Sequence, residues 1–382
     1  MKYYIIAGEA SGDLHGSNLI KELKKLDENA AMRCWGGDKM QAAGATLVKH
    51  YKDLAFMGFS EVLKNLPTIF KNLSYCKRDI LQYQPDVVIL IDYPGFNLRI
   101  AKWAKINGFK VIFYISPQVW AWKESRVKQI KKYVDKMLVI LPFEKEFYKK
   151  WNYNVEYVGH PLVEVITDFQ QENINNTLIA IGNFQPAVGN LNPGACIIAL
   201  LPGSRKQELK VKLPVMLKLT KHFPEHHFYV AKAPGITNEF YNSFFKDHIN
   251  VGTVTDQTYV LLMQAKAALV TSGTATLETA LFGVPEIVCY KGNALSYQLA
   301  KRLIKIKFIS LVNLIMNKEV VKELIQDALT VENLKKELSS ILNEDTKIQQ
   351  IKNDYAELKK ILQQGGNASL NAAVSIYKFI KS

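Results

Sequence analysis

The chain has 382 residues, of which 48% are hydrophobic and 22% are charged, and its formal net charge is +14 at pH 7. This length exceeds one typical core and predicts a globular protein of two domains. The four cysteines (Cys34, Cys76, Cys196 and Cys289) lie far apart, with no close pair of metal-ligand or redox spacing, so we expect reduced thiols in a cytoplasmic protein. The apolar run after Met1 is too short for a signal peptide, and no stretch approaches the length of a transmembrane span. The excess of basic residues implies an anionic partner, which is nucleic acid, a phosphate-bearing substrate or an anionic membrane surface.

The N-terminal stretch predicts a buried strand over residues 3–7, a turn with the sequence Gly-Glu-Ala-Ser-Gly-Asp over 8–13, and a helix over 14–26. Short strands and helices continue to alternate over 31–48, which favours βα units around a parallel sheet. The two glycines in the turn would let a ligand approach the backbone closely, although a simple tight turn has the same sequence.

Residues 56–73 place apolar side chains at helical spacing, interleaved with Lys64, Lys71 and polar groups. Core packing accounts for this pattern. The alternative is an exposed apolar and basic face that enters a membrane surface.

A nearly continuous apolar strand over 86–91 ends at Asp92. An acidic residue at the carboxyl end of a parallel strand lies where open α/β sheets bind ligands, although Asp92 could also cap the next helix. The following strand, 110–115, leads into a loop that contains Trp120 and Trp122, which either bind a ligand or only fill space. His160, between Gly159 and Pro161, is either a loop histidine or a ligand-facing one.

Residues 162–194 are polar and predict a linker, after which a second alternating series begins. Its strands are predicted over 196–201, 228–231, 251–254, 267–270 and 286–289, and the chain after Asn313 is predicted to be wholly helical, beginning with 318–326. Arg205 follows the first of these strands in a Pro-Gly-Ser-Arg turn, where it could bind a phosphate bidentately.

The strand that ends at Val270 meets a turn over 271–274 and then a helix over 275–282. Such a junction directs unpaired N–H groups and the positive end of a helix dipole at one point, so it can hold a phosphate. Glu278, one turn further along, could accept hydrogen bonds from a ribose, or it is a solvated residue of an ordinary βα turn.

Neither the Walker glycine-lysine spacing nor a Gly-x-Gly-x-x-Gly run is present, which argues against kinases, NTPases and dehydrogenases. Two Rossmann-like halves with an interdomain cleft suit transfer of a group from a nucleotide-activated donor. Because Asp-x-Asp is also absent, we expect no metal and no cofactor. The charge of a departing diphosphate would be met by Arg205 and helix N-termini.

Six motifs together resemble the lipid-A-disaccharide synthase family, in the same order along the chain. They begin at Gly8 (GEASGD), Ile91 (IDYPGFN), Ser116 (SPQVWAW), Gly159 (GHP), Leu201 (LPGSR) and Ser272 (SGTATLE). The chain departs from the family pattern at Gly95, where an acidic residue is expected, and at Val312, where proline is expected. The 173–194 segment is also longer than usual.

The resemblance implies a GT-B fold with an acceptor-binding domain over 1–165, a UDP-sugar-binding domain over 166–345 and C-terminal helices over 346–382 that pack back on the first domain or exchange between protomers. It implies an inverting transfer of 2,3-diacylglucosamine from UDP to 2,3-diacylglucosamine 1-phosphate through a β-1,6 linkage. Asp92 would be the base and Arg205 would stabilise the leaving diphosphate. The predicted uridine diphosphate site consists of Ser204, Arg205, Ser272, Gly273, Thr274, Thr276, Glu278 and Asn313. The residues predicted to contact the acceptor or line the cleft are Ser11, Gly12, Asn97, Gln118, Trp120 and His160.

Because both substrates carry acyl chains, we expect peripheral association with the cytoplasmic surface of the inner membrane. Phe56, Met57, Phe59, Trp120 and Trp122 would meet acyl chains, and basic residues would attract anionic headgroups. Whether the protein forms a homodimer stays open. The alternatives are a UDP-sugar epimerase of the same fold and, more remotely, a nucleic-acid-binding protein, but the basic residues form no recognised nucleic-acid motif.

Overall fold

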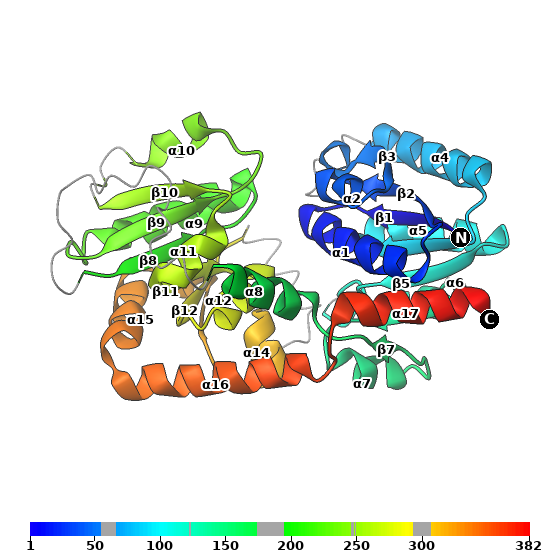
Figure 1. Ribbon diagram of the computed structural model, residues 1–382. Helices are drawn as coiled ribbons and strands as arrows, with labels where there is room; N and C mark the ends of the chain where they lie inside the picture. The colour runs from blue at the N-terminus through cyan, green and yellow to red at the C-terminus, as the bar shows by residue number, and fades with distance from the viewer. Residues whose placement is uncertain (55–65, 122–123, 174–194, 246–247, 249, 293–306) are drawn as a thin grey trace. The chain divides into compact units, whose positions relative to one another are not determined.

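The computed structural model describes residues 1–54, 66–121, 124–173, 195–245, 248, 250–292 and 307–382. The chain divides into two compact units, which are Met1–Glu164 with Leu362–Ser382, and Val165–Ile361. Each unit is a parallel sheet with helices, so both halves have the Rossmann-like architecture predicted from the alternating pattern (Figure 1).

The first unit contains a seven-stranded parallel sheet in the order β3-β2-β1-β4-β5-β6-β7. Its strands are β1 (Lys2–Ala7), β2 (Ala31–Gly36), β3 (Thr46–His50), β4 (Val87–Ile91), β5 (Lys110–Tyr114), β6 (Lys136–Val139) and β7 (Glu156–Tyr157). Its α-helices are α1 (Ala10–Leu26), α2 (Asp38–Ala42), α4 (Leu66–Tyr83), α5 (Pro94–Ile106), α6 (Val127–Tyr133), α7 (Glu144–Lys149) and α17 (Ala368–Lys381), while α8 (Pro161–Glu172) continues into the second unit. The central strand β4 is fully apolar and buried, and β1 is buried at every residue after the exposed Lys2, because helices cover both faces of a parallel sheet.

The second unit contains a six-stranded parallel sheet in the order β10-β9-β8-β11-β12-β13. Its strands are β8 (Ile197–Leu201), β9 (His227–Lys232), β10 (Val251–Thr255), β11 (Ala265–Thr271), β12 (Glu286–Tyr290) and β13 (Lys322–Ile325). Its helices are α9 (Lys206–Thr220), α10 (Asn238–Phe245), α11 (Thr258–Gln264), α12 (Thr274–Leu281), α14 (Leu311–Met316), α15 (Val331–Asn343) and α16 (Asp345–Gln363).

The helix predicted over residues 318–326 is wrong. Residues Lys322–Ile325 form β13, which pairs in parallel with β12, and a short 3-10 helix follows over Gln326–Ala328. Only Leu324 of this four-residue strand is buried, so the apolar pattern is too short to distinguish a strand from a helix turn. Pairing with β12, which is remote in the sequence, decides the conformation.

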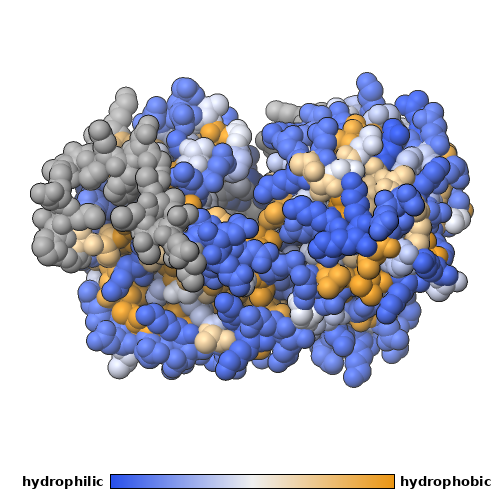
Figure 2. All heavy atoms as spheres, in the orientation of Figure 1, coloured by the Kyte–Doolittle hydropathy of each residue, from blue (hydrophilic) through white to orange (hydrophobic). Residues whose placement is uncertain are grey.

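The last two helices belong to different units. Helix α16 lies in the second unit up to Ile361, and α17 packs against α1 and β5 of the first unit. On the face drawn in Figure 2, the outer side of α16 is mostly hydrophilic, as expected for a helix with one buried face. Among the described residues, no helix combines the length and apolar character needed to cross a membrane.

Candidate active site

In the first unit, the carboxyl ends of β1 and β4 lie side by side, with Ala7 paired to Ile91. The chain leaves β1 toward β2 and β3 on one side of the sheet, whereas β4 and the later strands lie on the other side. A reversal of strand order opens a crevice at the carboxyl ends of the two central strands, which is where ligands of open α/β sheets bind. The sheet therefore brings the 8–13 turn next to Asp92.

Asp92 lies at this crevice, directly after β4, in a left-handed backbone conformation with φ of 41°. Burial, and after it the negative charge of Glu9, raises the pKa of its carboxyl group from 3.8 to about 7, although a hydrogen bond from the backbone of Tyr93 acts in the opposite direction. A carboxyl group with a pKa near neutrality can exchange a proton with a substrate under physiological conditions.

Asn97 holds the backbone at Asp92. Its Nδ2 donates to the carbonyl oxygens of Ile91 at 3.1 Å and Asp92 at 2.8 Å, and its side chain is fully buried. The predicted contact of Asn97 with the acceptor would need an exposed amide. The structure instead uses this amide to fix the left-handed turn that presents Asp92.

The glycines of the 8–13 turn allow close packing around Asp92. A Cβ atom on Gly8 would lie 2.3 Å from the ring of Tyr93, and one on Gly12 would lie 3.0 Å from the Cβ of Ala7. Gly12 is buried, whereas Ser11 is exposed at the start of α1. Of the predicted residues in this turn, only Ser11 offers its side chain to a ligand.

The loop after β5 lies one strand further along, because β5 pairs with β4. Gln118 is exposed in this loop, and the ring of Trp120 makes an edge contact with Phe143 at 4.9 Å. The hypothesis that Trp122 contacts acyl chains falls outside the described residues, as does that for Phe56, Met57 and Phe59.

Glu144 is a buried carboxyl group near this loop that sequence reasoning missed. Its Oε2 accepts a hydrogen bond from the N–H of Leu141 at 3.0 Å, and burial raises its pKa to about 8. Contacts with Ser116 and Trp120 oppose that rise, which places Glu144 beside the loop. An acidic residue five positions after the end of the buried strand β6 was the available signal, but a first-turn glutamate of a helix has the same pattern.

His160 is buried near His15 of α1. Burial lowers the pKa of His160 to about 3, with a further contribution from His15, and burial lowers the pKa of His15 to about 4. The N–H of Leu162 donates to Nδ1 of His160 at 3.3 Å, so the proton of the neutral ring is on Nε2. The structure places His160 in the interior, whereas its motif left open a ligand-facing position.

In the second unit, the strand order reverses between β8 and β11, where Leu201 pairs with Val270. The turn that carries Ser204 and Arg205 and the turn that carries Ser272 and Gly273 therefore meet at one edge of the sheet, as the sequence predicted for a phosphate site. Gly273 has φ of 133°, and its missing Cβ would face open space. Thr274 follows it in an exposed position at the start of α12.

Two cationic side chains lie at the carboxyl ends of β8 and β11. Arg205 is exposed, and its guanidinium lies 3.6 Å from Glu208. Lys212, which the sequence analysis did not single out, is buried; its Nζ contacts the hydroxyl of Thr271 and lies 3.5 Å from Glu208. Burial lowers the pKa of Lys212, and Glu208 opposes that shift. The helix spacing of Lys212 resembled that of solvated lysines, so only the packing of α9 on the sheet reveals it.

The hydroxyl groups of this edge mostly shape the turn. Ser272 donates to the carbonyl of Ile309 at 2.8 Å, and the buried Thr276 donates to the carbonyl of Gly273 at 2.8 Å. Glu278 accepts a hydrogen bond from the hydroxyl of Tyr259 at 2.9 Å, and burial raises the pKa of its carboxyl group. The backbone of the turn, Thr274 and Glu278 are thus the groups best placed to meet a ligand.

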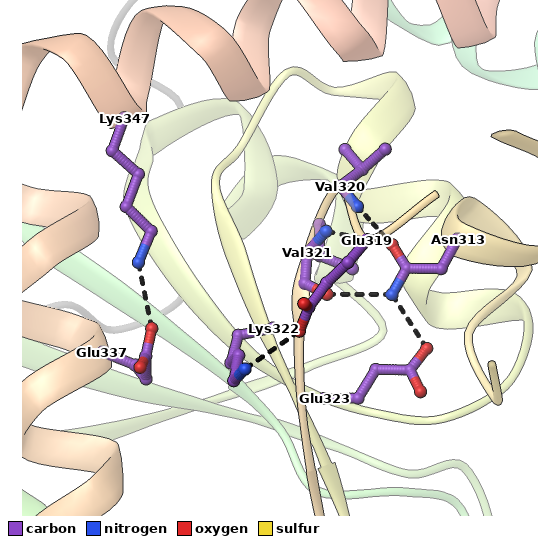
Figure 3. A network of polar contacts seen from close by, with 8 residues as sticks. All are labelled: Asn313, Glu319, Val320, Val321, Lys322, Glu323, Glu337 and Lys347. Carbon is purple, nitrogen blue, oxygen red and sulfur yellow. Dashed lines mark hydrogen bonds and ion pairs between the residues drawn. The ribbon is translucent and has the colours of Figure 1, made fainter. Parts of the chain in front are cut away.

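Asn313 is fully buried, and its amide is occupied within the second unit (Figure 3). Its Oδ1 accepts from the N–H groups of Val320 at 2.8 Å and Val321 at 3.0 Å, and its Nδ2 donates to Glu323 and the carbonyl of Val321, both at 2.9 Å. A side-chain amide offers two acceptor positions and two N–H donors, so these four hydrogen bonds leave no donor or acceptor of the side chain for a nucleotide. Asn313 therefore anchors α14 to β13, in place of the direct nucleotide contact predicted from the sequence.

Among the described ranges, no group of three or more His, Cys, Asp or Glu side chains is arranged to hold a metal ion. The absence of a metal requirement stays a prediction.

The fold matches solved structures of sugar-nucleotide enzymes. A UDP-GlcNAc 2-epimerase from Neisseria meningitidis bound to UDP-GlcNAc superimposes with a TM-score of 0.67 at 12% identity, and the match covers 100% of each chain. The glycotransferase of kitacinnamycin gives a TM-score of 0.64 at 14% identity and covers 99% of this chain and 98% of the other. At this identity the similarity shows the fold alone, and it confirms the predicted GT-B class.

Sequence comparison is more specific. The chain is 39% identical to the lipid-A-disaccharide synthase of Syntrophus aciditrophicus over 99% of its own length and 98% of the relative's. It is 38% identical to the lipid-A-disaccharide synthases of Geobacter metallireducens, over 95% and 93%, and Coxiella burnetii, over 99% and 98%. The family model described as lipid-A-disaccharide synthetase matches residues 3–378. The chain therefore belongs to the lipid-A-disaccharide synthetase family.

Proposed function

We propose that this glycosyltransferase joins UDP-2,3-diacylglucosamine to 2,3-diacylglucosamine 1-phosphate, with release of UDP. The observation that carries the proposal is the pair of strand-order reversals, one lined by Asp92 and the other by Arg205 and the 271–274 turn. Family membership supplies the substrate class.

In this proposal the second unit binds the UDP portion of the donor. The N-terminus of α12, with Gly273 and Thr274, and the Ser204–Arg205 turn would bind the diphosphate through N–H groups and the guanidinium. Glu278, oriented by Tyr259, would accept hydrogen bonds from the ribose. As the glycosidic C–O bond to the diphosphate breaks, the positive charge of Arg205 would stabilise the departing oxygen, and no metal ion would be required.

The first unit would bind the acceptor and supply the base. The 6-hydroxyl oxygen attacks the anomeric carbon from the face opposite UDP, and its proton passes to the carboxylate of Asp92, which leaves the donor sugar inverted. Ser11 and Gln118 are exposed beside the same strand ends and would contact the acceptor sugar. Gly12, Asn97, Trp120 and His160 would act by shaping this surface.

Both substrates carry acyl chains, so the protein would work at the cytoplasmic surface of the inner membrane. The basic composition, with a net charge of +14, would favour an anionic surface.

A transfer assay tests the proposal with both acylated glucosamine substrates, comparing the wild type with Asp92→Asn and Arg205→Ala. We expect disaccharide and UDP from the wild type. Asp92→Asn should lower kcat by about 10³-fold, within the range removed with a general base. Arg205→Ala should lower kcat/KM by about 10²-fold. Incubation of the wild type with UDP-N-acetylglucosamine alone is the control, since epimerisation without an acceptor would support the rival function. Full activity of Asp92→Asn would contradict the assigned base.

A further inference from the structure

A groove of about 640 Å³ lies on the first unit, lined by residues of α4 and α5 and by Arg126 and Gln129 at the start of α6. Its apolar lining consists of the buried Leu73 and Leu98 and the more exposed Phe70, Trp103 and Ile106. The side chains of Phe70 and Ile106 are 59% and 67% exposed. Large apolar side chains at the rim of a hollow are typical of a surface that a ligand covers.

Four cations surround this apolar lining, and no carboxylate is among the described residues that line the groove. They are Lys77, Arg99, Lys102 and Arg126. Burial lowers the pKa of Arg126, and the like charge of Arg99 lowers it further. Two neighbouring guanidinium groups repel each other, and a phosphate that binds both relieves the repulsion.

The groove begins close to the proposed base. Pro94 lines it and follows Asp92 by two residues, a distance of at most about 7 Å along an extended chain. Gly95, Arg99, Lys102 and Ile106 recur at intervals of three or four residues, so they form one face of α5. Along this helix of 13 residues, which is about 20 Å long, the catalytic end comes first, then the cations, then the apolar end.

We propose that this groove is the lipid subsite for the acceptor, in which Arg99 and Arg126 bind its phosphate and the Trp103–Ile106 end holds an acyl chain. The proposal rests on the proposed function and deepens it, because it states how a phosphorylated, acylated sugar is bound beside Asp92. An acylated phosphosugar carries an anionic group and an apolar chain on the same sugar ring. These two groups match the cations and the apolar end that follow one another along α5. A free phosphate would leave the apolar end uncovered.

The phosphate arm of the test measures kinetics in detergent micelles with the Arg99→Gln and Arg126→Gln double variant. We expect the KM for 2,3-diacylglucosamine 1-phosphate to rise tenfold or more, as for loss of charge-assisted hydrogen bonds, with the KM for the UDP-sugar and kcat changed less than twofold. With 2,3-diacylglucosamine that lacks the phosphate, the variant and the wild type should have equal KM. Lys128→Gln with Lys132→Gln is the matched control, because it removes two exposed cations of α6 outside the groove.

The acyl arm uses Ile106→Ser, whose exposed position keeps the fold intact. The KM for the long-chain acceptor should rise about fivefold, and the effect should vanish with an acceptor of short acyl chains. Val211→Ser, at a 40% exposed site on the second unit, is the control.

Three outcomes would overturn the inference. The first is an unchanged acceptor KM in the Arg99→Gln and Arg126→Gln double variant, and the second is an equal rise of its KM for acceptors with and without the phosphate. The third is that the double variant no longer binds phosphatidylglycerol vesicles but keeps a normal acceptor KM in micelles. The last outcome would identify a membrane phospholipid as the occupant. If the wild type makes no disaccharide, the proposed function itself fails. The groove is then tested by direct titration with micellar 2,3-diacylglucosamine 1-phosphate, where equal affinity of the double variant and the wild type would overturn it.

Discussion

The two units place opposite charges at the same point of the same architecture. In the first unit the strand-order reversal lies between β1 and β4 and carries Asp92 near Glu9. In the second it lies between β8 and β11 and carries Arg205 and Lys212. The parallel sheet determines where a ligand binds, and the residues in the two turns determine whether that place exchanges a proton or holds a phosphate.

Each unit also uses one buried asparagine to hold its edge. Asn97 binds the carbonyls at the end of β4, and Asn313 binds the backbone before β13. In both units, a polar residue predicted to bind a ligand instead makes hydrogen bonds that hold the protein's own backbone.

Ionisation of Asp92 should have the largest effect and should distinguish the first unit from the second. Since the pKa is raised to about 7, the carboxylate is present above pH 7 and is lost as the pH falls through that value. At pH 5 only about 1% is ionised, so kcat/KM should be about 100-fold below its plateau above pH 8. A pH series of initial rates with subsaturating substrates measures this.

Glu9→Gln sharpens that prediction, because it removes the like charge that helps to raise the pKa of Asp92. The inflection should move to lower pH. Glu28→Gln is the control, since it lies beyond the far end of α1, about 25 Å away for a helix of 17 residues. A kcat/KM that does not change with pH, or an inflection at the same pH in Glu9→Gln and the wild type, would mean that Asp92 is not the titrating base.

Substitution of the two asparagines tests whether Asn97 in the first unit and Asn313 in the second have the same role. Asn97→Ala and Asn313→Ala each leave buried backbone groups unpaired, so each should lower the free energy of unfolding by about 3 kcal/mol. Urea unfolding midpoints measure this, with the exposed Asn154→Ala as the control. Only Asn97→Ala should also lower kcat, because it alone frees the turn that presents Asp92. Equal loss of kcat in both variants would argue against a separate role for the first edge.

The smallest effect is expected at the hydroxyl of Tyr259, which orients Glu278 at 2.9 Å. Tyr259→Phe removes one hydrogen bond, worth about 1 kcal/mol, and should raise the KM for the UDP-sugar about fivefold without changing the acceptor KM. Tyr377→Phe on α17 serves as the comparison variant. A change confined to the acceptor KM would contradict the assignment of Glu278 to the UDP-sugar.

The sequence by itself determined the parallel βα architecture of both halves, because buried parallel strands such as 87–91 and 267–270 are continuous apolar runs followed by turn residues. It also determined the family and the turns that carry Asp92, Arg205 and Gly273, because polar residues and glycine directly after such strands are local features. The prediction of a helix over 318–326 was wrong at β13, because these four residues become a strand only by pairing with β12.

Only the tertiary structure decided which polar groups are free to meet a ligand. Asn313 and Thr276 have the residue types of a binding site, yet their side chains are buried against the backbone. Lys212, Glu144 and the cations beside α5 have the residue types of solvated helix faces, yet packing buries the first two and gathers the others around an apolar groove. Burial and hydrogen-bond partners come from segments remote in the sequence, so no local pattern contains them.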